Sequence, residues 1–187
     1  LPWLIENFDL KYKPIHLVRH PLSVLSSLLK LDWQSNRHTI KHKSPFQEEY
    51  EIQFESITKN MKSPVEKAMT RWCLDNVYLL NHAQRDKAWK TVYYEDLFLN
   101  SEKEFTNLLT ETGIPYDVEK VSQLSFRKIS QTSFKEEPEI TEPINQLSKW
   151  KKKLTDQEIH EALNVLKAFG VNDYGEEVLP LHQHNSK

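Results

Sequence analysis

An arginine, a proline and a serine near the amino end have the spacing of a phosphate site. The segment reads IHLVRHPLSVLSS and contains Arg19, Pro21 and Ser27. The guanidinium fork of an arginine forms two parallel hydrogen bonds to a phosphate, whereas a lysine offers only a point charge. A helix beginning at Pro21 would point backbone N–H groups and its positive dipole end toward the same ligand. Ser27 could add a hydroxyl donor.

The same residues also have an ordinary structural interpretation. An arginine at the end of a strand often forms an ion pair within the fold. A serine on a helix often donates to a carbonyl of the preceding turn. The residue types alone leave both interpretations open.

Two short apolar runs and the helices around them would position these residues. Residues 15–19 form a run that ends at Arg19 and predicts a buried strand, and Lys90–Tyr94 predicts a second strand. Leucines at helical spacing follow Pro21, so we expect a helix directly after the first strand. Ligands of open α/β sheets lie beyond the carboxyl ends of the strands, which is where Arg19 falls.

Helical periodicity and capping patterns predict further helices. We expect them from about Pro64 to Arg85, from Ser101 to Gly113, from about Asp117, and from Thr155 to Gly170. Ser101 with Glu104, and Thr155 with Glu158, have the spacing of a capping box. Strands that alternate with helices favour an α/β layered fold with a mainly parallel sheet.

Length and composition predict one domain with a modest core. The chain has 187 residues, and 38% of them are hydrophobic, which is below the usual fraction. We expect a single domain over residues 1–187, with a surface excursion at 35–63 and a tail at 176–187. The low apolar fraction and a first residue inside an apolar segment predict a domain that is incomplete at its amino terminus.

Charge, cysteine content and hydropathy argue against several classes of protein. The 25 basic and 27 acidic residues give a net charge of −2, so we expect no nucleic-acid surface. The single cysteine, Cys73, provides neither an internal disulfide nor a zinc site, which favours a reducing compartment such as the cytoplasm of a bacterium-like cell. No apolar stretch approaches the ~20 residues that span a bilayer. The oligomeric state stays open.

The segment that carries Arg19 resembles the 3′-phosphate motif of sulfotransferases that use 3′-phosphoadenosine-5′-phosphosulfate (PAPS). In that motif a strand ends in Arg, a Pro follows two residues later and a Ser eight residues after the Arg, as do Pro21 and Ser27. The resemblance implies a P-loop-like three-layer fold in which Arg19 and Ser27 bind the 3′-phosphate of PAPS. His20 replaces a commonly acidic residue, which we expect to affect the turn more than the phosphate contact.

Weaker resemblances follow in the order of the same family. The sequence YYEDL resembles the second-strand motif of bacterial and tyrosylprotein sulfotransferases, which implies that Tyr94 contacts the donor. Thr132 and Ser133 resemble the nucleotide-contact segment of cytosolic sulfotransferases. Tyr94 could equally well only pack at the end of its strand.

A donor-binding loop is expected at residues 125–149. Its end, QLSKW, resembles the carboxy-terminal donor loop of tyrosylprotein sulfotransferases, with Lys149 as the phosphate ligand. Lys149 also belongs to the run KWKKK and could simply be a solvated lysine. We expect Trp150 to be a packing residue.

Two parts of the sulfotransferase site are missing from the sequence. None of the three glycines lies in a Gly-rich phosphate loop, and the catalytic base of the family is expected upstream of Leu1. The resemblance implies transfer to a hydroxyl or amine of a small molecule, a carbohydrate or a tyrosyl peptide, without a metal, and inactivity of this chain alone. A non-catalytic 3′-phosphonucleotide-binding module, a P-loop kinase-like protein and a purely structural domain remain alternatives.

Overall fold

The computed structural model describes residues 1–30, 52–123 and 142–181. The chain forms two compact units. The first unit comprises Leu1–Arg19 and Leu79–Ser148, and the second comprises His20–Tyr78 and Lys149–Lys187. Thr132 and Ser133, and parts of the expected excursion, donor-binding loop and tail, lie outside the described residues.

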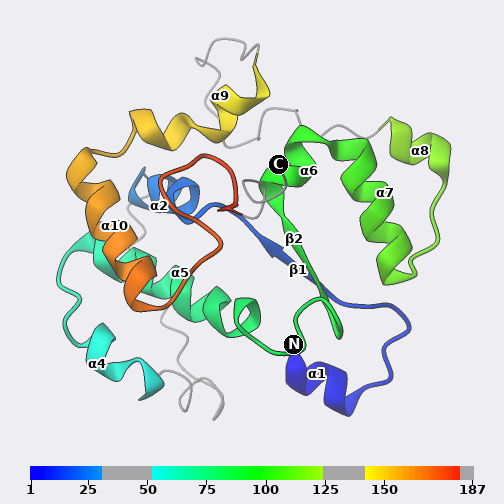
Figure 1. Cartoon of the computed structure of the whole chain (residues 1–187), viewed down its shortest axis with the longest axis horizontal. Coiled ribbons are helices and arrows are strands. Elements are labelled where there is room, and N and C mark those ends of the chain that lie inside the picture. The colour runs from blue at the N-terminus through cyan, green and yellow to red at the C-terminus, as the bar shows by residue number, and fades with distance from the viewer. Residues whose placement is uncertain (31–51, 124–141, 182–187) are drawn as a thin grey trace. The chain divides into compact units, whose positions relative to one another are not determined.

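A parallel pair of strands lies in the first unit and confirms both predicted strands (Figure 1). β1 spans Ile15–Val18 and β2 spans Lys90–Tyr93, each one residue shorter than expected. In the ladder Ile15 is the partner of Lys90, and Val18 is the partner of Tyr93. The described chain is therefore a helix-rich α/β structure, as the alternation of patterns predicted.

One face of β1 is open, which corrects the prediction of a fully buried strand. The side chains of Ile15 and Leu17 are 41% and 55% exposed, whereas those of His16 and Val18 are buried. The β2 partner of Leu17 is Val92, which is buried. The apolar run predicted burial on both faces because periodicity cannot tell which face of a strand is covered by neighbouring elements.

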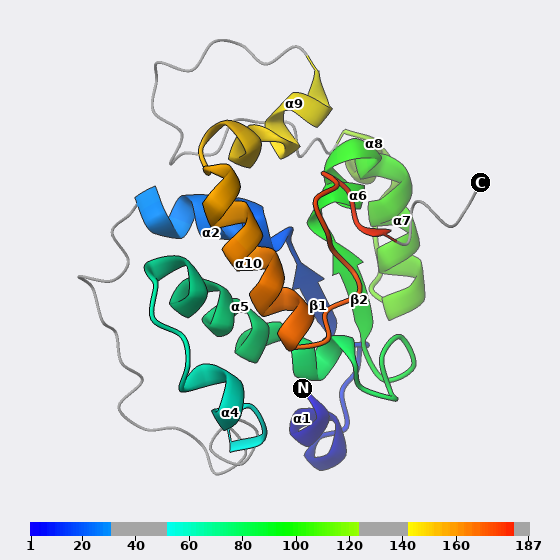
Figure 2. The same ribbon diagram turned by 60° about the vertical axis from the view of Figure 1, so that its left-hand side comes forward.

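Helix α7 explains why the β2 side of that face is covered. α7 spans Ser101–Thr112 and runs beside β2 (Figure 1 and Figure 2). Val92 packs in a small core with Leu108 of α7 and Leu97, and Phe105 packs against this core. Leu17, on the β1 side of this face, stays largely exposed.

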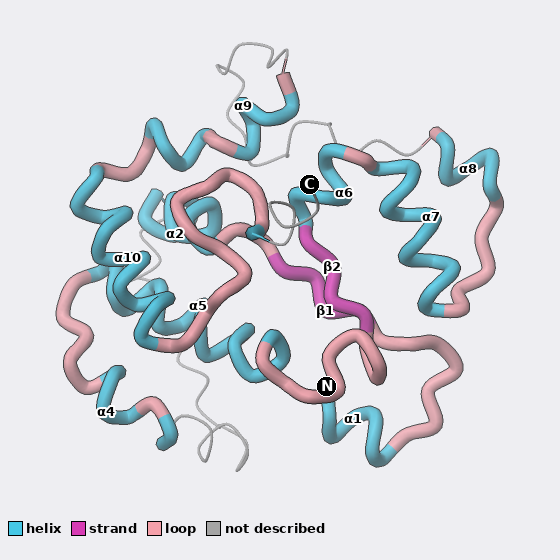
Figure 3. The backbone as a smooth tube through the Cα atoms, viewed as in Figure 1, coloured by secondary structure: helices cyan, strands magenta, loops and turns pink. Residues whose placement is uncertain are grey.

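Three of the helices described in the first unit were not predicted from the sequence pattern. β2 passes directly into α6 (Figure 3). α6 spans Tyr94–Leu99, so Tyr94 is the first helical residue and not the last residue of the strand. The other helices are α1 (Pro2–Asn7), α8 (Val118–Ser122) and α9 (Pro143–Leu147). α9 contacts α6. Residues 143–147 of the expected donor-binding loop are therefore helical.

The ends of α7 match the prediction at one terminus only. Gly113 follows the helix with a φ of 74°, a left-handed conformation that glycine adopts without strain. At the amino end the cap residue is Asn100, and its side chain makes no capping hydrogen bond. The predicted capping box of Ser101 and Glu104 does not form, because the helix begins one residue too early for Ser101 to be the cap.

The second unit is built from helices. They are α2 (Pro21–Lys30), α4 (Glu55–Thr58), α5 (Pro64–Leu80), the short 3₁₀ helix η1 (Lys149–Lys152) and α10 (Asp156–Ala168). α5 ends five residues before the expected Arg85. Met69, Trp72 and Cys73 lie at helical spacing on α5, and all three are buried. At α10 the predicted capping box of Thr155 and Glu158 is present.

None of the helices in the described ranges combines the length and the apolar character required to cross a bilayer.

Candidate functional site

Arg19 and Tyr94 lie together at the carboxyl ends of the two parallel strands. Arg19 follows Val18, the last residue of β1, and Tyr94 follows Tyr93, the last residue of β2. Because Val18 and Tyr93 are partners in the ladder, the two following residues reach the same edge of the sheet. The guanidinium carbon of Arg19 lies over the Tyr94 ring, 4.7 Å from its centroid. Two residues predicted to contact the donor are thus in direct contact with each other.

The guanidinium of Arg19 has no acidic partner in the described part of the chain. Its side chain is exposed, and within residues 1–30, 52–123 and 142–181 it forms no hydrogen bond or ion pair. The alternative of a structural ion pair therefore has no support among these residues. Among the described residues, the N–H groups of Arg19 are therefore not engaged by a carboxylate or a carbonyl.

Tyr94 is attached to the core through its own helix. Its ring centroid lies 5.9 Å from that of Phe98, one helical turn further along α6. Phe98 is only 1% exposed, whereas Tyr94 is half-buried. Because Phe98 packs against the Tyr94 ring, the ring provides a fixed contact surface for the long, flexible side chain of Arg19.

The amino end of α2 is partly occupied by His20. Pro21 has no N–H group, and the N–H of Leu22 donates to Nδ1 of His20 at 3.2 Å. The N–H of Val24 donates to the carbonyl of His20 at 3.1 Å. The prediction that this helix end presents free amides is therefore wrong for Leu22, because the histidine side chain acts as a cap.

His20 is a fully buried packing residue of the second unit. Its Nδ1 accepts a hydrogen bond, so in the neutral ring Nε2 carries the proton and donates it to the carbonyl of Glu177 at 2.8 Å. The ring stacks on Trp150 at 5.1 Å and meets the edge of Tyr174 at 4.9 Å. The residue after the motif arginine therefore shapes the turn into α2.

Ser27 makes the contact that its structural interpretation predicts. It is exposed on α2, and its hydroxyl donates to the carbonyl of Ser23 at 3.2 Å. The hydroxyl would have to exchange this partner in order to donate to a phosphate. Arg19 belongs to the first unit and Ser27 to the second.

Lys149 begins η1 in the second unit and is half-buried. The next residue, Trp150, is 2% exposed, as expected for a packing residue.

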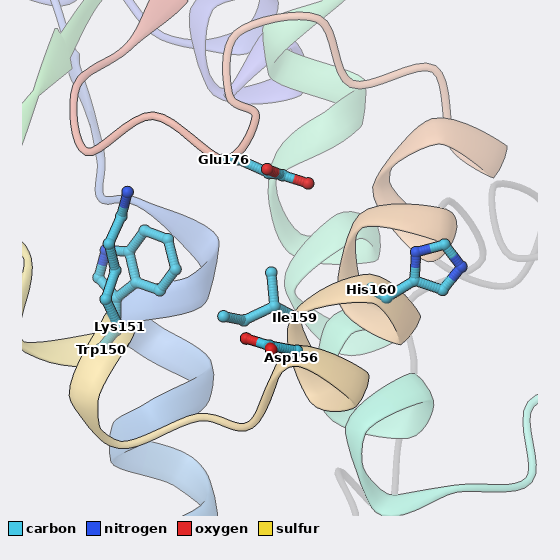
Figure 4. Close-up of a pocket in the computed structure, with 6 residues that line it drawn as sticks. All are labelled: Trp150, Lys151, Asp156, Ile159, His160 and Glu176. Carbon is cyan, nitrogen blue, oxygen red and sulfur yellow. The ribbon is translucent and has the colours of Figure 1, made fainter.

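A separate pocket lies within the second unit (Figure 4). Its cavity measures ≈ 520 Å³. It is lined by Trp150, Lys151, Asp156, Ile159, His160 and Glu176. The ammonium of Lys151 lies 5.2 Å from the centroid of the Trp150 ring, and it forms no ion pair with either carboxylate of the pocket. Because the indole is almost fully covered, the pocket offers a small molecule mainly exposed charged groups.

No residue of this pocket was predicted as a ligand. The lining side chains come from η1, from the first turns of α10 and from the segment after α10. These three segments come together only in the folded chain, so no motif within one segment indicates the pocket.

Comparisons with known proteins give no match. No family model, no curated protein and no solved structure is significantly similar to the chain.

Other reactive groups of the described residues give no further candidate for catalysis. Cys73 is buried in α5, and burial raises the pKa of its thiol far above the usual value, so the thiolate is suppressed. Across the three described ranges, no three His, Cys, Asp or Glu side chains gather in a way that could hold a metal ion.

Proposed function

We propose that this chain carries the 3′-phosphate half of the donor site of a PAPS-dependent sulfotransferase. The observation that supports this most is the guanidinium of Arg19, which is exposed, has no ion pair in the described residues and lies beside Tyr94 at the ends of two parallel strands. This is the ligand-binding edge of open α/β sheets. The proline and serine that follow Arg19 match the phosphate motif of the family.

The fold in this proposal is P-loop-like, with three layers. Its support is the parallel pairing of β1 with β2, and a helix that follows each strand closely. The same sheet architecture also occurs in kinases, so the fold alone does not decide the donor.

The reaction in the complete enzyme would be an in-line displacement at sulfur. A hydroxyl or amine of the acceptor forms the new bond to sulfur, and 3′-phosphoadenosine-5′-phosphate leaves with the electrons of the broken S–O bond. Arg19 and Ser27, with Thr132, Ser133 and Lys149 as further donor contacts, would bind and orient the nucleotide. Such residues contribute to the rate by holding the reacting groups in line.

Calorimetric titration with 3′-phosphoadenosine-5′-phosphate tests the proposal. We expect the wild-type chain to bind it, and Arg19→Ala to bind at least about tenfold more weakly, since hydrogen bonds to charged groups are lost. The control is Arg71→Ala, because Arg71 is also exposed but forms an ion pair with Asp75 on α5. Equal binding by the Arg19 variant contradicts the proposal, and a preference for ATP favours the kinase-like alternative.

A non-catalytic nucleotide-binding module is the second candidate, and the glycines favour it. Gly113 and Gly170 end helices with φ values of 74° and 71°, and Gly175 lies in the carboxy-terminal segment. No Gly-rich loop is left to bind the 5′-phosphosulfate. Both candidates predict that the isolated chain binds the nucleotide without turnover. Sulfation by this chain in a PAPS assay would exclude the module and would also show that the expected inactivity of this chain alone is wrong.

A further inference from the structure

The guanidinium carbon of Arg19 lies over the aromatic ring of Tyr94. The distance of 4.7 Å from the guanidinium carbon to the ring centroid is within the range of a cation–π contact. A guanidinium commonly stacks on an aromatic face, and in a stacked pair its in-plane N–H groups stay outside the contact. These N–H groups are the ones that bind a phosphate in bidentate fashion.

Without the ring, little in the described first unit would orient this side chain. Arg19 is exposed and has no hydrogen bond or ion pair there, so its orientation depends on the contact with Tyr94. Tyr94 itself is held by the start of α6 and by buried Phe98. Buried Phe98 thus packs against Tyr94, and Tyr94 in turn contacts the Arg19 guanidinium at the strand ends.

We propose that Tyr94 is a positioning residue, whose ring orients the Arg19 guanidinium so that its N–H edge receives a phosphoryl group. This inference rests on the proposed function for the identity of the ligand. It differs from the role that the family resemblance implies for Tyr94, which is a direct contact with the donor. The contribution of Tyr94 comes from its aromatic ring, and the hydroxyl is dispensable.

Three variants separate the ring from the hydroxyl. Tyr94→Phe keeps the ring, Tyr94→Leu removes it, and Tyr116→Leu is the control, since Tyr116 is a partly exposed tyrosine of the same unit. Binding of 3′-phosphoadenosine-5′-phosphate is expected to stay within about threefold of wild type in Tyr94→Phe and in the control. It is expected to weaken about tenfold in Tyr94→Leu, because orientation and the cation–π contact are both lost.

The outcomes distinguish this inference from the proposed function. If the wild type binds and Arg19→Ala does not, but Tyr94→Leu binds like wild type, only the positioning role is wrong. If Tyr94→Phe is as weak as Tyr94→Leu, the hydroxyl is the ligand contact and the inference is overturned. Absence of wild-type binding to the nucleotide and to inorganic pyrophosphate would refute the proposed function.

A spectroscopic measurement tests the orientation without any ligand. In the free protein the Nε–Hε signal of Arg19, assigned by its loss in Arg19→Lys, should be shifted by the ring current of Tyr94. The shift should persist in Tyr94→Phe and disappear in Tyr94→Leu. An unshifted signal in the wild type would overturn the inference, whatever the binding results.

Discussion

The imidazole of His20 donates a hydrogen bond to the main-chain carbonyl of Glu177, which lies at the other end of the chain sequence. His20 is the first residue of the second unit, so the start of this unit is tied to its own carboxy-terminal segment. The same ring accepts a hydrogen bond from the first turn of α2 and stacks on Trp150. One side chain therefore joins the start of α2 to η1 and to the segment after α10.

Replacing His20 should destabilise the second unit. His20→Ala removes a helix cap and a buried hydrogen bond and leaves a cavity beside Trp150, which together should lower the free energy of unfolding by about 2–4 kcal/mol. Urea denaturation followed by tryptophan fluorescence measures this. The control is His160→Ala, because His160 is exposed on α10 and its loss should change stability by less than about 0.5 kcal/mol. Equal midpoints for the two variants would contradict this role of His20.

The carboxylate of Glu66, in the first turn of α5, should make stability depend on pH. The carboxylate of Glu66 accepts hydrogen bonds from the N–H groups of Lys62 and Ser63, and these bonds lower its pKa from the usual value. A carboxyl whose pKa is lower in the folded state contributes stability above its unfolded pKa, and that contribution is lost as the pH falls through the folded pKa.

Glu66→Gln keeps the oxygen acceptor but removes the charge. We expect it to lower stability at neutral pH by about 0.5 kcal/mol, a small effect because the group is largely solvated, and to have no effect at pH 2. Thermal unfolding measured from pH 2 to 7 checks this. Glu102→Gln is the matched control, since Glu102 lies in the first turn of α7 and accepts no hydrogen bond from a described residue. If Glu66→Gln lowers stability equally at pH 2 and pH 7, the charge of the Glu66 carboxylate does not contribute to stability.

The open face of β1 should tolerate a charge that the covered face does not. Leu17→Lys changes an exposed side chain, so the free energy of unfolding should shift by less than about 0.5 kcal/mol. Val18→Lys places an ammonium at a position that is 1% exposed and should cost about 3 kcal/mol or more. Chemical denaturation of both variants is the measurement. Severe destabilisation by Leu17→Lys would show that this face is covered in the native protein.

Cys73 should be unreactive in the folded chain. Its thiol is buried and its pKa is raised by that burial, so neither access nor thiolate is available to a disulfide reagent. We expect Ellman's reagent at pH 8 to react with Cys73 only after urea unfolds the chain. Rapid labelling of the native protein would show that the Cys73 thiol is accessible and not buried.

Short-range patterns predicted the local elements well. The strands at residues 15 and 90, the capping box at Thr155 and the left-handed glycine after α7 each depend on residues a few positions apart. The residues that predict each of these elements therefore all lie within one short segment of the sequence. The prediction failed where two local preferences competed. Tyr94 continues the apolar run of β2, yet it begins α6, whose first turn carries the acidic residues Glu95 and Asp96.

The sequence by itself determined which residue types could bind an oxyanion, and in what order they occur. Only the tertiary structure decided their partners. In the folded chain the Tyr94 ring contacts the Arg19 guanidinium, and the N–H of Leu22 donates to the His20 ring. Folding also leaves Leu17 exposed and buries Val92. The physical reason is that burial and contact depend on which distant segments pack together. Which segments pack together depends on the total surface buried over the whole chain, and the spacing of residues within one motif does not determine it.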